Sequence, residues 1–417
     1  MEIRYILQKK QEDTKMGSMT HAAGRAAFST ALDVTLKNLN KKPEGEIVKL
    51  IDLMQKYMDG EKIDIDYDKA KQMVLDQDGT LNKYIHRLLD EVDPYVLKMT
   101  ALNLGYEAFF HGTKTIRKMR EVQKCNIPWL ILMDPTSACN LHCTGCWAAE
   151  YGHKLNLTFD EMDKVVTQGK ELGVYLYMFT GGEPLVRKAD LVKLCEKHSD
   201  CAFLAFTNGT LVDEAFCADL KRIGNLYLAI SLEGFSEVND LRRGTGVFAK
   251  VMHAMDLLKE NGLVFGTSIC YTSKNYKTVT SDEFIDMIVE KGCRYALYFH
   301  YMPVGNDASL ELLPNPEQRL YIKDRVREIR NMTSGKGIFT MDFQNDGEFV
   351  GGCIAGGRNY FHINANGDAE PCVFIHYSGA NIRTHSMLEI LKQPLFMAYH
   401  DNQPFNENHY RPCPMLE

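Results

Sequence analysis

Short apolar runs alternate with amphipathic stretches from residue 129 to about residue 300. The runs predict strands at 129–133, 175–179, 202–206, 226–231, 264–270 and 295–300. Between and after them, apolar residues recur at helical spacing over about 159–172, 189–198, 212–222, 247–261 and 280–291. Such alternation is typical of parallel strands joined by right-handed crossovers. Six units of this kind favour an α/β fold, either a doubly wound sheet or a partial barrel.

The regions on either side follow other patterns. Residues 1–124 are predicted to be mostly helical, with apolar residues at helical spacing over 22–39, 45–58 and 94–122 and a polar break at 76–80. The apolar stretch 103–111 is expected to pack against another domain of the protein and not against a hydrophobic ligand. After about residue 315 the alternation fades into a helix at 315–333 and a Gly-rich region. We therefore expect three domains, at 1–124, 125–314 and 315–417.

Polar and cysteine-containing motifs follow the predicted strands. Cys139, Cys143 and Cys146 follow the first strand, and Thr180-Gly-Gly-Glu-Pro184 follows the second. Asn208 follows the third strand, and Ser231-Leu-Glu-Gly234 ends the fourth. Because ligands gather at the carboxyl ends of parallel strands, these motifs are expected to meet at one rim.

Composition narrows the class of protein. The chain has 417 residues, is 45% hydrophobic and has a formal net charge of −7 with both signs mixed, so no basic face indicates nucleic-acid binding. The first residues lack the apolar region of a signal peptide, and no run reaches the roughly 18–20 apolar residues that span a bilayer. Twelve cysteines in such a chain indicate a reducing cytoplasm and metal chemistry, not disulfides.

The cysteine motif indicates the kind of metal group. Soft thiolates at short spacing suit an iron–sulfur cluster or zinc. A closed structural zinc site needs four protein ligands, and His142 is poorly placed to complete the set of Cys139, Cys143 and Cys146. Three thiolates on a four-iron cluster leave one iron open to another ligand. The odd number therefore favours a cluster with an open iron.

Cys139-x3-Cys143-x2-Cys146, together with Gly181-Gly-Glu-Pro184, resembles the radical S-adenosylmethionine (radical SAM) superfamily over about residues 127–305. The resemblance implies a partial (β/α)6 barrel holding a three-cysteine [4Fe–4S] cluster whose open iron binds SAM. It also implies electron transfer into SAM, release of a 5′-deoxyadenosyl radical and hydrogen abstraction from a substrate. Such a protein is an oxygen-sensitive enzyme of the oxidoreductase or transferase type, with an electron donor such as ferredoxin or flavodoxin.

The resemblance also implies a set of SAM contacts. These are Gly181, Gly182, Glu183, Pro184, Asn208, Ser231, Glu233 and Arg243. Several assignments have alternatives: Gly181 and Gly182 also suit a tight turn, Asn208 suits a turn, and many relatives have Asp in place of Glu233. Arg243 matches an arginine that pairs with the SAM carboxylate, although Arg242 beside it is an alternative partner, and both arginines suit a solvated surface.

One position departs from the family pattern. Many relatives carry an aromatic residue immediately before the third cysteine, where this chain has Gly145. Trp147 follows the third cysteine and is expected to cover the cluster or the adenine from another direction. No catalytic base is assigned, because Asp342 and Asp346 are expected to be isolated surface carboxylates.

The C-terminal cysteines form a second motif, Cys353-x13-Gly-x4-Cys372. Its Asn366-Gly367 pair predicts a hairpin turn between two strands. The motif resembles the start of a SPASM or twitch domain, which holds auxiliary [4Fe–4S] clusters, with Cys413 as a third ligand and Cys125 as a speculative fourth. Either these cysteines hold one auxiliary cluster with an incomplete set of protein ligands, or the sequence is truncated. The alternative is that the cysteines hold zinc or no metal.

The remaining cysteines are interpreted as core thiols, because free cysteine behaves as a small hydrophobe. They are Cys195, Cys201, Cys217, Cys270 and Cys293. For the substrate, the family resemblance favours a ribosomally made peptide or a protein. Two alternatives stay open: modification of lipid acyl chains, covered by the helices at 94–122, and an iron–sulfur carrier or sensor that binds SAM without cleaving it. A cytoplasmic location is expected.

Overall fold

The computed structural model describes residues 21–38, 43–57, 66–305, 308–405, 413 and 415. Within them, nine strands form one sheet in the order β7-β6-β5-β4-β3-β2-β1-β8-β9. The first six are β1 (Leu130–Met133), β2 (Leu176–Phe179), β3 (Ala202–Thr207), β4 (Leu226–Ser231), β5 (Phe265–Tyr271) and β6 (Tyr295–His300). Neighbours among them pair in parallel. The predicted strands and the partial barrel are confirmed.

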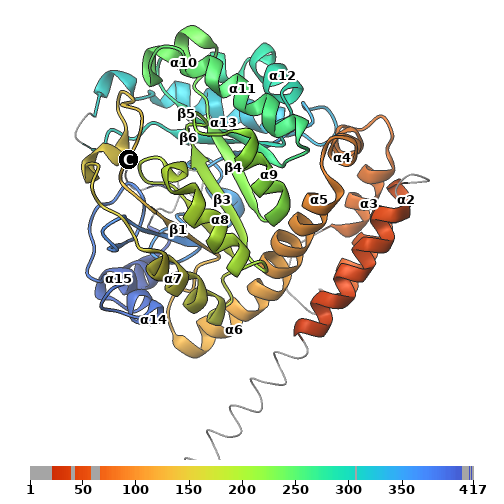
Figure 1. The fold of residues 1–417 in the computed structure, drawn as a ribbon, viewed down its shortest axis with the longest axis horizontal. Helices are drawn as coiled ribbons and strands as arrows, with labels where there is room; N and C mark the ends of the chain where they lie inside the picture. The colour runs from red at the N-terminus through yellow and green to blue at the C-terminus, as the bar shows by residue number, and fades with distance from the viewer. Residues whose placement is uncertain are drawn as a thin grey trace, which may run out of the picture.

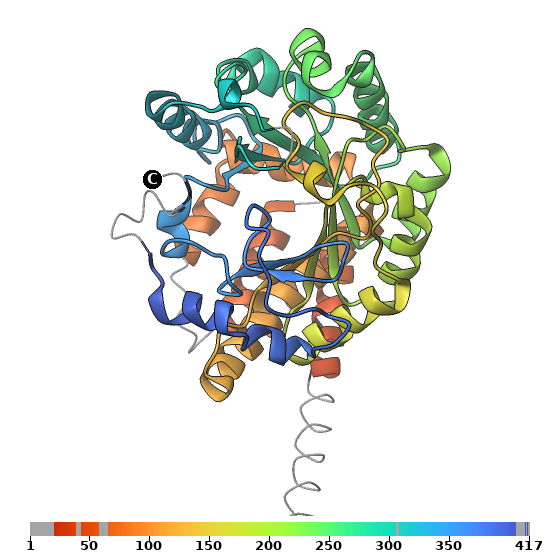
Figure 2. The same ribbon diagram turned by 90° about the vertical axis from the view of Figure 1, so that its left-hand side faces the viewer.

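Helices follow the strands and cover the outer face of the sheet (Figures 1 and 2). They are α7 (Phe159–Glu171), α8 (Lys188–Lys197), α9 (Glu214–Ile223), α10 (Ser236–Arg243), α11 (Val247–Glu260), α12 (Asp282–Glu290) and α13 (Pro316–Ile329). Local signals fix their ends: Thr158 and Glu161 form a capping box before α7, and Gly224 ends α9 in the left-handed conformation. The short helix α10 was not predicted.

The sheet extends beyond the six expected strands. Strand β7 (Phe339–Asp342) pairs in parallel with β6, and β8 (Tyr360–Ile363) pairs in parallel with β1. Strand β9 (Ala369–Glu370) returns antiparallel to β8, so the hairpin predicted at Asn366-Gly367 is confirmed. Helices α14 (Met387–Leu391) and α15 (Pro394–Asn402) follow. The C-terminal region, blue in Figure 2, thus lies on the open side of the barrel beside β1.

The N-terminal region is helical, as predicted. It comprises helix 21–38 followed by α2 (Pro43–Tyr57), α3 (Tyr67–Leu75), α4 (Thr80–Glu91), α5 (Pro94–Thr100) and α6 (Thr113–Gln123). Between α5 and α6 the chain forms a π-helix, Ala101–Gly112. Leu102 and Tyr106 on it pack with Met99 of α5 and with Phe28 and Leu32 of helix 21–38. The apolar stretch at 103–111 is therefore largely a packing surface.

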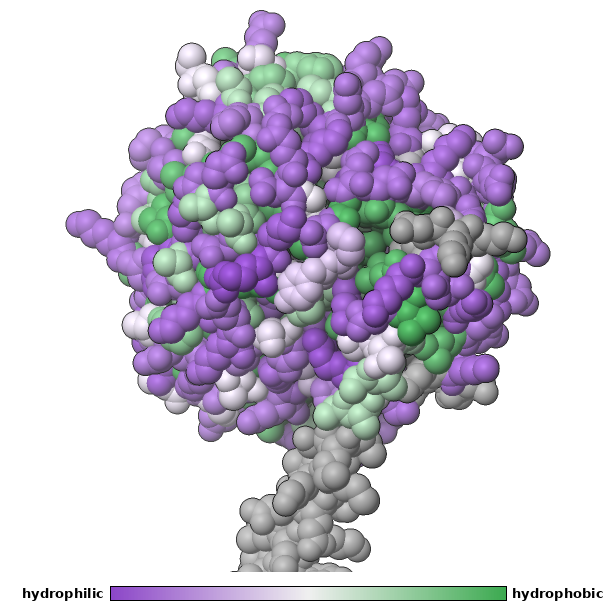
Figure 3. All heavy atoms as spheres, turned by 45° about the vertical axis from the view of Figure 1, so that its right-hand side comes forward, coloured by the Kyte–Doolittle hydropathy of each residue, from purple (hydrophilic) through white to green (hydrophobic). Residues whose placement is uncertain are grey.

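The main core lies between the sheet and its helices and includes apolar residues from β1 to β8. The face that carries α2 and α5 is mostly hydrophilic, with small hydrophobic groups between the hydrophilic residues (Figure 3). No helix of the described residues is both long and apolar enough to cross a membrane.

Candidate active site

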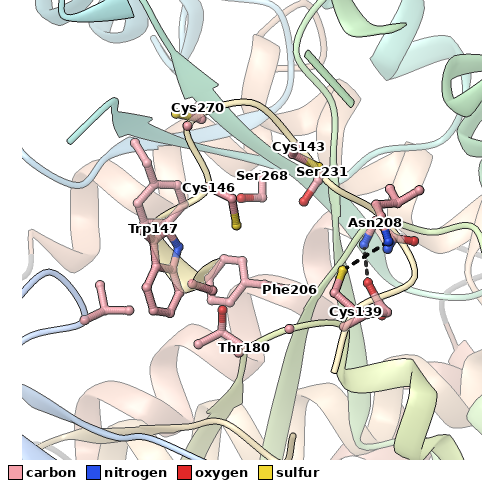
Figure 4. A pocket seen from close by; sticks show the side chains of 18 of the residues that line it. Cys139, Cys143, Cys146, Trp147, Thr180, Phe206, Asn208, Ser231, Ser268 and Cys270 are labelled. Carbon is pink, nitrogen blue, oxygen red and sulfur yellow. Dashed lines mark hydrogen bonds between the residues drawn. The ribbon is translucent and has the colours of Figure 1, made fainter. Parts of the chain in front are cut away.

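A pocket opens at the carboxyl ends of β1 to β6, with about 1090 Å³ of unfilled space including its mouth, which suits a small-molecule cofactor or substrate. All three cysteines of the loop after β1 line it, with Gly181, Gly182, Glu183, Asn208, Ser231, Arg242 and Arg243. Figure 4 shows the thiols of Cys139, Cys143 and Cys146 around one space, with Trp147 on one side and Asn208 on the other. The motifs that follow four separate strands therefore meet.

Two glycines let the loop after β2 lie directly against the cysteine loop. Gly181 has φ +104°, and a side chain on Gly182 would place its Cβ 2.2 Å from the carbonyl oxygen of Ala138. The N–H of Gly182 donates to the carbonyl of Thr136 at 3.0 Å, and that of Glu183 donates to Ala138 at 2.8 Å. The glycines thus fix the backbone just before Cys139.

The three thiols are partly buried. Burial raises the pKa of Cys139 to about 11 and raises that of Cys143, while the Arg243 guanidinium opposes the shift at Cys143. The Nη1 of Arg243 lies 3.9 Å from the Cys143 sulfur, and the N–H of Leu141 donates to the Cys139 sulfur at 3.4 Å. Desolvated thiols beside cations become thiolates most readily when a metal group replaces their protons.

Glu183 is buried and joins the ends of β2 and β3. Its carboxylate accepts hydrogen bonds from the hydroxyl of Thr207 at 2.6 Å, the N–H of Asn208 at 2.7 Å and the N–H of Leu185 at 2.9 Å. Burial raises its pKa, and these donors oppose the shift. Asn208 in turn donates to Asn140 of the cysteine loop at 2.8 Å. Pro184, also buried, begins the short helix that follows.

Arg242 and Arg243, at the end of α10, converge on Glu233. Arg242 Nη1 lies 2.7 Å from Glu233 Oε1, and Arg243 Nε donates to the same oxygen at 3.0 Å. Glu233 is fully buried behind the arginines and outside the pocket lining, so in this arrangement it orients them. Both arginine side chains are largely buried, at 13% and 12% exposure, so they do not form a solvated surface. Because two guanidiniums face one carboxylate, one positive charge is left over for an anionic group.

The departure at Gly145 has a structural explanation. Gly145 has φ +68°, and a Cβ there would lie 2.7 Å from the hydroxyl oxygen of Tyr301. Tyr301, directly after β6, is buried and lines the pocket. An aromatic ring therefore does stand beside the third cysteine, but it comes from the end of β6.

Trp147 lies where the cysteine loop meets the C-terminal region. Its ring is 5.8 Å from that of His362 on β8 and 6.3 Å from that of Phe374. His362 is fully buried between two carboxylates, with Nε2 2.9 Å from Asp134 and Nδ1 2.8 Å from Glu370. These carboxylates raise its pKa to about 9 against the opposing effect of burial.

The C-terminal cysteines also come together. The thiols of Cys353 and Cys413 act electrostatically on Cys372, and burial with these neighbours raises the pKa of Cys372 to about 12. The hydroxyl of Tyr360 donates to the Cys372 sulfur at 2.7 Å. Cys125 instead packs in the main core, and no contact joins it to these thiols among the described residues. The two residues after Cys372, Val373 and Phe374, line the pocket of the first triad.

Sequence reasoning missed several residues of the site. Cys270, interpreted as a core thiol, lines the pocket at the end of β5, as do His300 and Tyr301 at the end of β6. Their positions at strand ends were the available signal. Asp342 is buried and hydrogen-bonded to Asn345, and Asp346 pairs with Arg330, so neither is an isolated surface carboxylate.

The donors fit an iron–sulfur cluster with SAM. Three thiols and an unbalanced guanidinium share the pocket, and the orphaned, buried Oε2 of Glu233 makes no hydrogen bond within the described residues. No three His, Cys, Asp or Glu side chains of the described part of the chain are drawn together as one metal ion requires. A cluster of several irons binds its cysteine ligands at wider distances from one another than a single metal ion does.

Residues 133–289 match the Radical SAM superfamily, and residues 353–415 match the SPASM family, described as an iron–sulfur cluster-binding domain. The chain belongs to the radical SAM superfamily and carries a SPASM domain. Radical SAM proteins of this kind bind a [4Fe–4S] cluster and SAM in the core and auxiliary iron–sulfur clusters in the SPASM domain, and so does this one.

Named relatives are enzymes with different substrates. The chain is 26% identical to the Fe-coproporphyrin III synthase of Methanosarcina barkeri over 231 residues, 53% of this chain and 57% of that relative. It is 26% identical to the PqqA peptide cyclase of Granulibacter bethesdensis over 260 residues, 59% of this chain and 67% of that relative. The chain thus spans little more than half of the first relative's length.

A solved structure supports the fold. That of Streptococcus suis SuiB bound to precursor peptide SuiA matches with a TM-score of 0.58 at 17% identity, covering 77% of this chain and 76% of that chain. At this identity the match establishes the shared architecture.

Proposed function

We propose that the chain is an oxidoreductase or transferase that cleaves SAM reductively. The resulting radical abstracts hydrogen from a peptide or protein substrate. The observation that carries the proposal is the meeting of three thiols and a surplus guanidinium in one pocket. Thiolates suit the cluster, and a guanidinium suits the carboxylate of SAM. When bound, cluster and SAM supply a 5′-deoxyadenosyl radical.

The residues of the pocket divide this work. In the proposal, Cys139, Cys143 and Cys146 hold the cluster. The SAM site is formed by Gly181, Gly182, Glu183, Pro184, Asn208, Ser231, Glu233 and Arg243. Glu233 acts by orienting Arg243 and Arg242, whose buried ion pairs keep both guanidiniums at the pocket wall. Tyr301 and Trp147 exclude water beside the third cysteine.

Cys353, Cys372 and Cys413 are proposed to hold an auxiliary cluster. Because Val373 and Phe374 separate Cys372 from the first pocket, a substrate in that pocket lies between the two cysteine groups. We propose an external one-electron donor of the ferredoxin or flavodoxin class. The location in the cytoplasm and the domain boundaries at 124 and 314 stay predictions.

Two substrate classes have support. The PqqA peptide cyclase supports a peptide, and the pocket offers it the small polar side chains of Thr180 and Ser268. The Fe-coproporphyrin III synthase supports a porphyrin as second candidate. That candidate is favoured by the aromatic rings of Trp147, Phe206, Phe299 and Phe374 in the pocket lining.

The lipid alternative has less support. The apolar side chains expected to cover an acyl chain, including Leu102 and Tyr106, already pack against helix 21–38. The large apolar residues of 94–122 that stay exposed are Tyr95, Phe109 and Val122. A carrier or sensor that binds SAM without cleaving it stays a separate alternative, which the following assay excludes or supports.

The test is anaerobic reconstitution of the full chain with iron and sulfide, followed by SAM and dithionite. We expect 5′-deoxyadenosine from the wild-type protein and none from Cys139→Ala. Cys217→Ala, which removes a buried thiol from α9 outside the pocket, is the matched control and keeps the activity. A reconstituted wild-type protein that binds SAM but yields no 5′-deoxyadenosine contradicts the proposal and supports the carrier.

A further inference from the structure

A group of cations lies where α6 meets the C-terminal region. Arg117, Arg120 and Lys124 recur at intervals of three and four residues and therefore share one side of α6 and its end. Lys392, directly after α14, donates to the side chain of the last residue of α6 at 3.0 Å, and α6 lies beside α14 in Figures 1 and 2. Arg120 also donates to the backbone carbonyl of Arg358. We refer to these five residues as the basic face.

Few carboxylates lie near enough in the chain to balance this charge. Residues 114–124 hold five cations and one acidic residue, Glu121, and residues 353–359 hold no acidic residue. On the adjoining helices, Glu389 is hydrogen-bonded to the start of α14, and Asp401 contacts its neighbouring histidine. The whole chain has a net charge of −7, so the basic face has the opposite sign to the molecule that carries it.

The cations of the basic face contact neutral groups in the described structure. Arg120 Nε donates to the carbonyl of Ile127 at 2.9 Å, and Lys392 donates to an amide oxygen. Lys124 is exposed and has φ +54°, the one positive value at a non-glycine position among the described residues. Glycine or asparagine is the usual residue at such a helix end, so backbone geometry does not explain a lysine there.

The basic face adjoins both segments that carry buried C-terminal cysteines. Nη1 of Arg358 donates to the carbonyl of Cys353 at 2.8 Å. In the same loop, the N–H of Gly356 donates to the carbonyl of Pro371 at 2.9 Å, and Pro371 directly precedes Cys372. One hydrogen bond therefore joins the loop of Arg358 to each cysteine segment. A protein bound on the basic face places its own redox centre near a cluster held by these cysteines.

We propose that the basic face docks an acidic one-electron carrier protein of the ferredoxin or flavodoxin class. The proposal rests on the proposed function, which needs such a donor. Because the rest of the chain repels an acidic surface, complementary charge directs the encounter to this face. Electron-transfer encounters use small interfaces, so a few cations suffice. In the transfer, the carrier loses one electron and the cluster held by Cys353, Cys372 and Cys413 gains it, with no change in bonds or protons.

The test measures binding of the reconstituted full chain to an oxidised acidic [2Fe–2S] ferredoxin and, separately, to an oxidised flavodoxin, by calorimetry at low and high salt. We expect at least one carrier to bind and its binding to weaken with salt. The double variant Lys124→Gly/Lys392→Gln is expected to weaken binding about fivefold at low salt. Glycine suits the left-handed backbone at 124, and Lys392 is exposed, so the variant is expected to keep the fold.

The matched control is Lys83→Gln/Lys250→Gln. It removes the same charge from exposed positions of α4 and α11, which lie far from α6 and α14 (Figure 1). The control is expected to bind the carrier as the wild type does. In a second readout, 5′-deoxyadenosine formation driven by limiting reduced carrier is expected to fall about fivefold in the Lys124→Gly/Lys392→Gln variant. Formation driven by dithionite, which needs no docking, is expected to stay at the wild-type rate.

The outcomes separate docking from catalysis. Failure of both carriers to bind, binding that neither salt nor the double variant changes, or an equal loss in the control overturns the proposal. Binding of a short DNA duplex that the double variant abolishes, without binding of either carrier, assigns the face to nucleic acid instead. Because calorimetry needs no SAM cleavage, absence of 5′-deoxyadenosine with dithionite contradicts the proposed function alone.

Discussion

Single residues set how closely the loops of the site approach each other. A Cβ on Gly182 would meet the carbonyl carbon and oxygen of Ala138 at 2.5 Å or less. Real Cβ atoms do not approach backbone so closely, so this contact between the two motif loops requires glycine. The motif spacing predicted a tight turn here. It did not indicate that the partner is the backbone preceding the first cysteine.

Gly145 is the second such position, and we predict that Gly145→Ala lowers the free energy of unfolding by about 2 kcal/mol. The left-handed backbone costs a non-glycine residue about 1–2 kcal/mol, and the new Cβ would lie within 3 Å of the Tyr301 ring. Urea denaturation of the cluster-free chain measures the change. In a double-mutant cycle, Tyr301→Ala is expected to relieve the steric part of the loss but not the backbone part. Strictly additive effects would contradict the proposed contact.

Tyr360 controls the environment of one sulfur. Removing its hydroxyl with Tyr360→Phe deletes the hydrogen bond to Cys372. Hydrogen bonds to cluster sulfurs stabilise the reduced, more negative state, so the reduction potential of an auxiliary cluster held there is expected to fall. A hydrogen bond worth about 1 kcal/mol corresponds to about 40 mV for one electron.

Redox titration followed by electron paramagnetic resonance measures this shift. Tyr399→Phe is the control, because Tyr399 lies near the same thiols but makes no hydrogen bond to sulfur in the described structure. A larger shift in Tyr399→Phe than in Tyr360→Phe would contradict the assignment.

At the scale of elements, a buried charge network joins β1, β8, β9 and the cysteine loop. His362 on β8 bridges Asp134 after β1 and Glu370 on β9, and Tyr151 of the cysteine loop donates to Glu370 at 2.7 Å. All these strands are short, so backbone pairing alone gives few hydrogen bonds between them. The network therefore ties the C-terminal region to the core.

This network makes stability depend on pH. The pKa of His362 is raised to about 9 in the folded chain, against about 6.5 when unfolded. The folded chain binds this proton more tightly than the unfolded chain does. The contribution of His362 to the free energy of unfolding is therefore complete below about pH 6.5 and is lost as the pH rises through 9. A shift of this size corresponds to about 3 kcal/mol. We expect the free energy of unfolding, measured by urea denaturation of the cluster-free chain, to fall by about that amount from pH 6 to pH 9.5.

His362→Gln is expected to be less stable at pH 6 and to lose this slope. His253→Gln, at an exposed histidine, is the control and keeps it. An unchanged slope in His362→Gln would show that other groups cause the pH dependence.

At the scale of the molecule, two groups of cysteines flank one pocket. The first lies in a loop after β1, and the second is held around the β8–β9 hairpin. Because β8 pairs directly with β1, the strands beside the two groups belong to one continuous sheet. The pocket is lined by residues from both regions, among them Trp147 and Phe374.

We predict that the two cysteine groups bind iron separately. Iron analysis after anaerobic reconstitution is expected to show a loss of about four irons per chain when Cys139, Cys143 and Cys146 are all replaced by alanine. Replacing Cys353, Cys372 and Cys413 is expected to remove the remaining iron and to leave SAM binding in place. Cys217→Ala, the control at a core thiol, is expected to keep the full iron content of the wild-type chain. Zinc at either group, or iron unaffected by the second set of substitutions, would contradict the two-cluster arrangement.

The sequence by itself determined the elements and the chemistry at their ends. Runs such as 226–231 and 295–300 coincide with β4 and β6, because an apolar run bounded by polar turns has few other stable forms. The triad of Cys139, Cys143 and Cys146 and the Gly-Gly-Glu-Pro segment identified the family, because contiguous spacing records ligand geometry directly. Asn366-Gly367 predicted its hairpin for a similarly local reason.

Only the tertiary structure decided which distant residues complete the site. Nothing local to Cys270 or Tyr301 separates a pocket residue from a core residue, since cysteines and tyrosines also fill the core between the sheet and its helices. The pairing of β8 with β1, which brings Phe374 beside Trp147, depends on contacts more than 200 residues apart. The spacing of apolar residues along the chain indicates whether an element is a helix or a strand and which of its faces is buried. What that face meets is fixed when the whole sheet closes around its core.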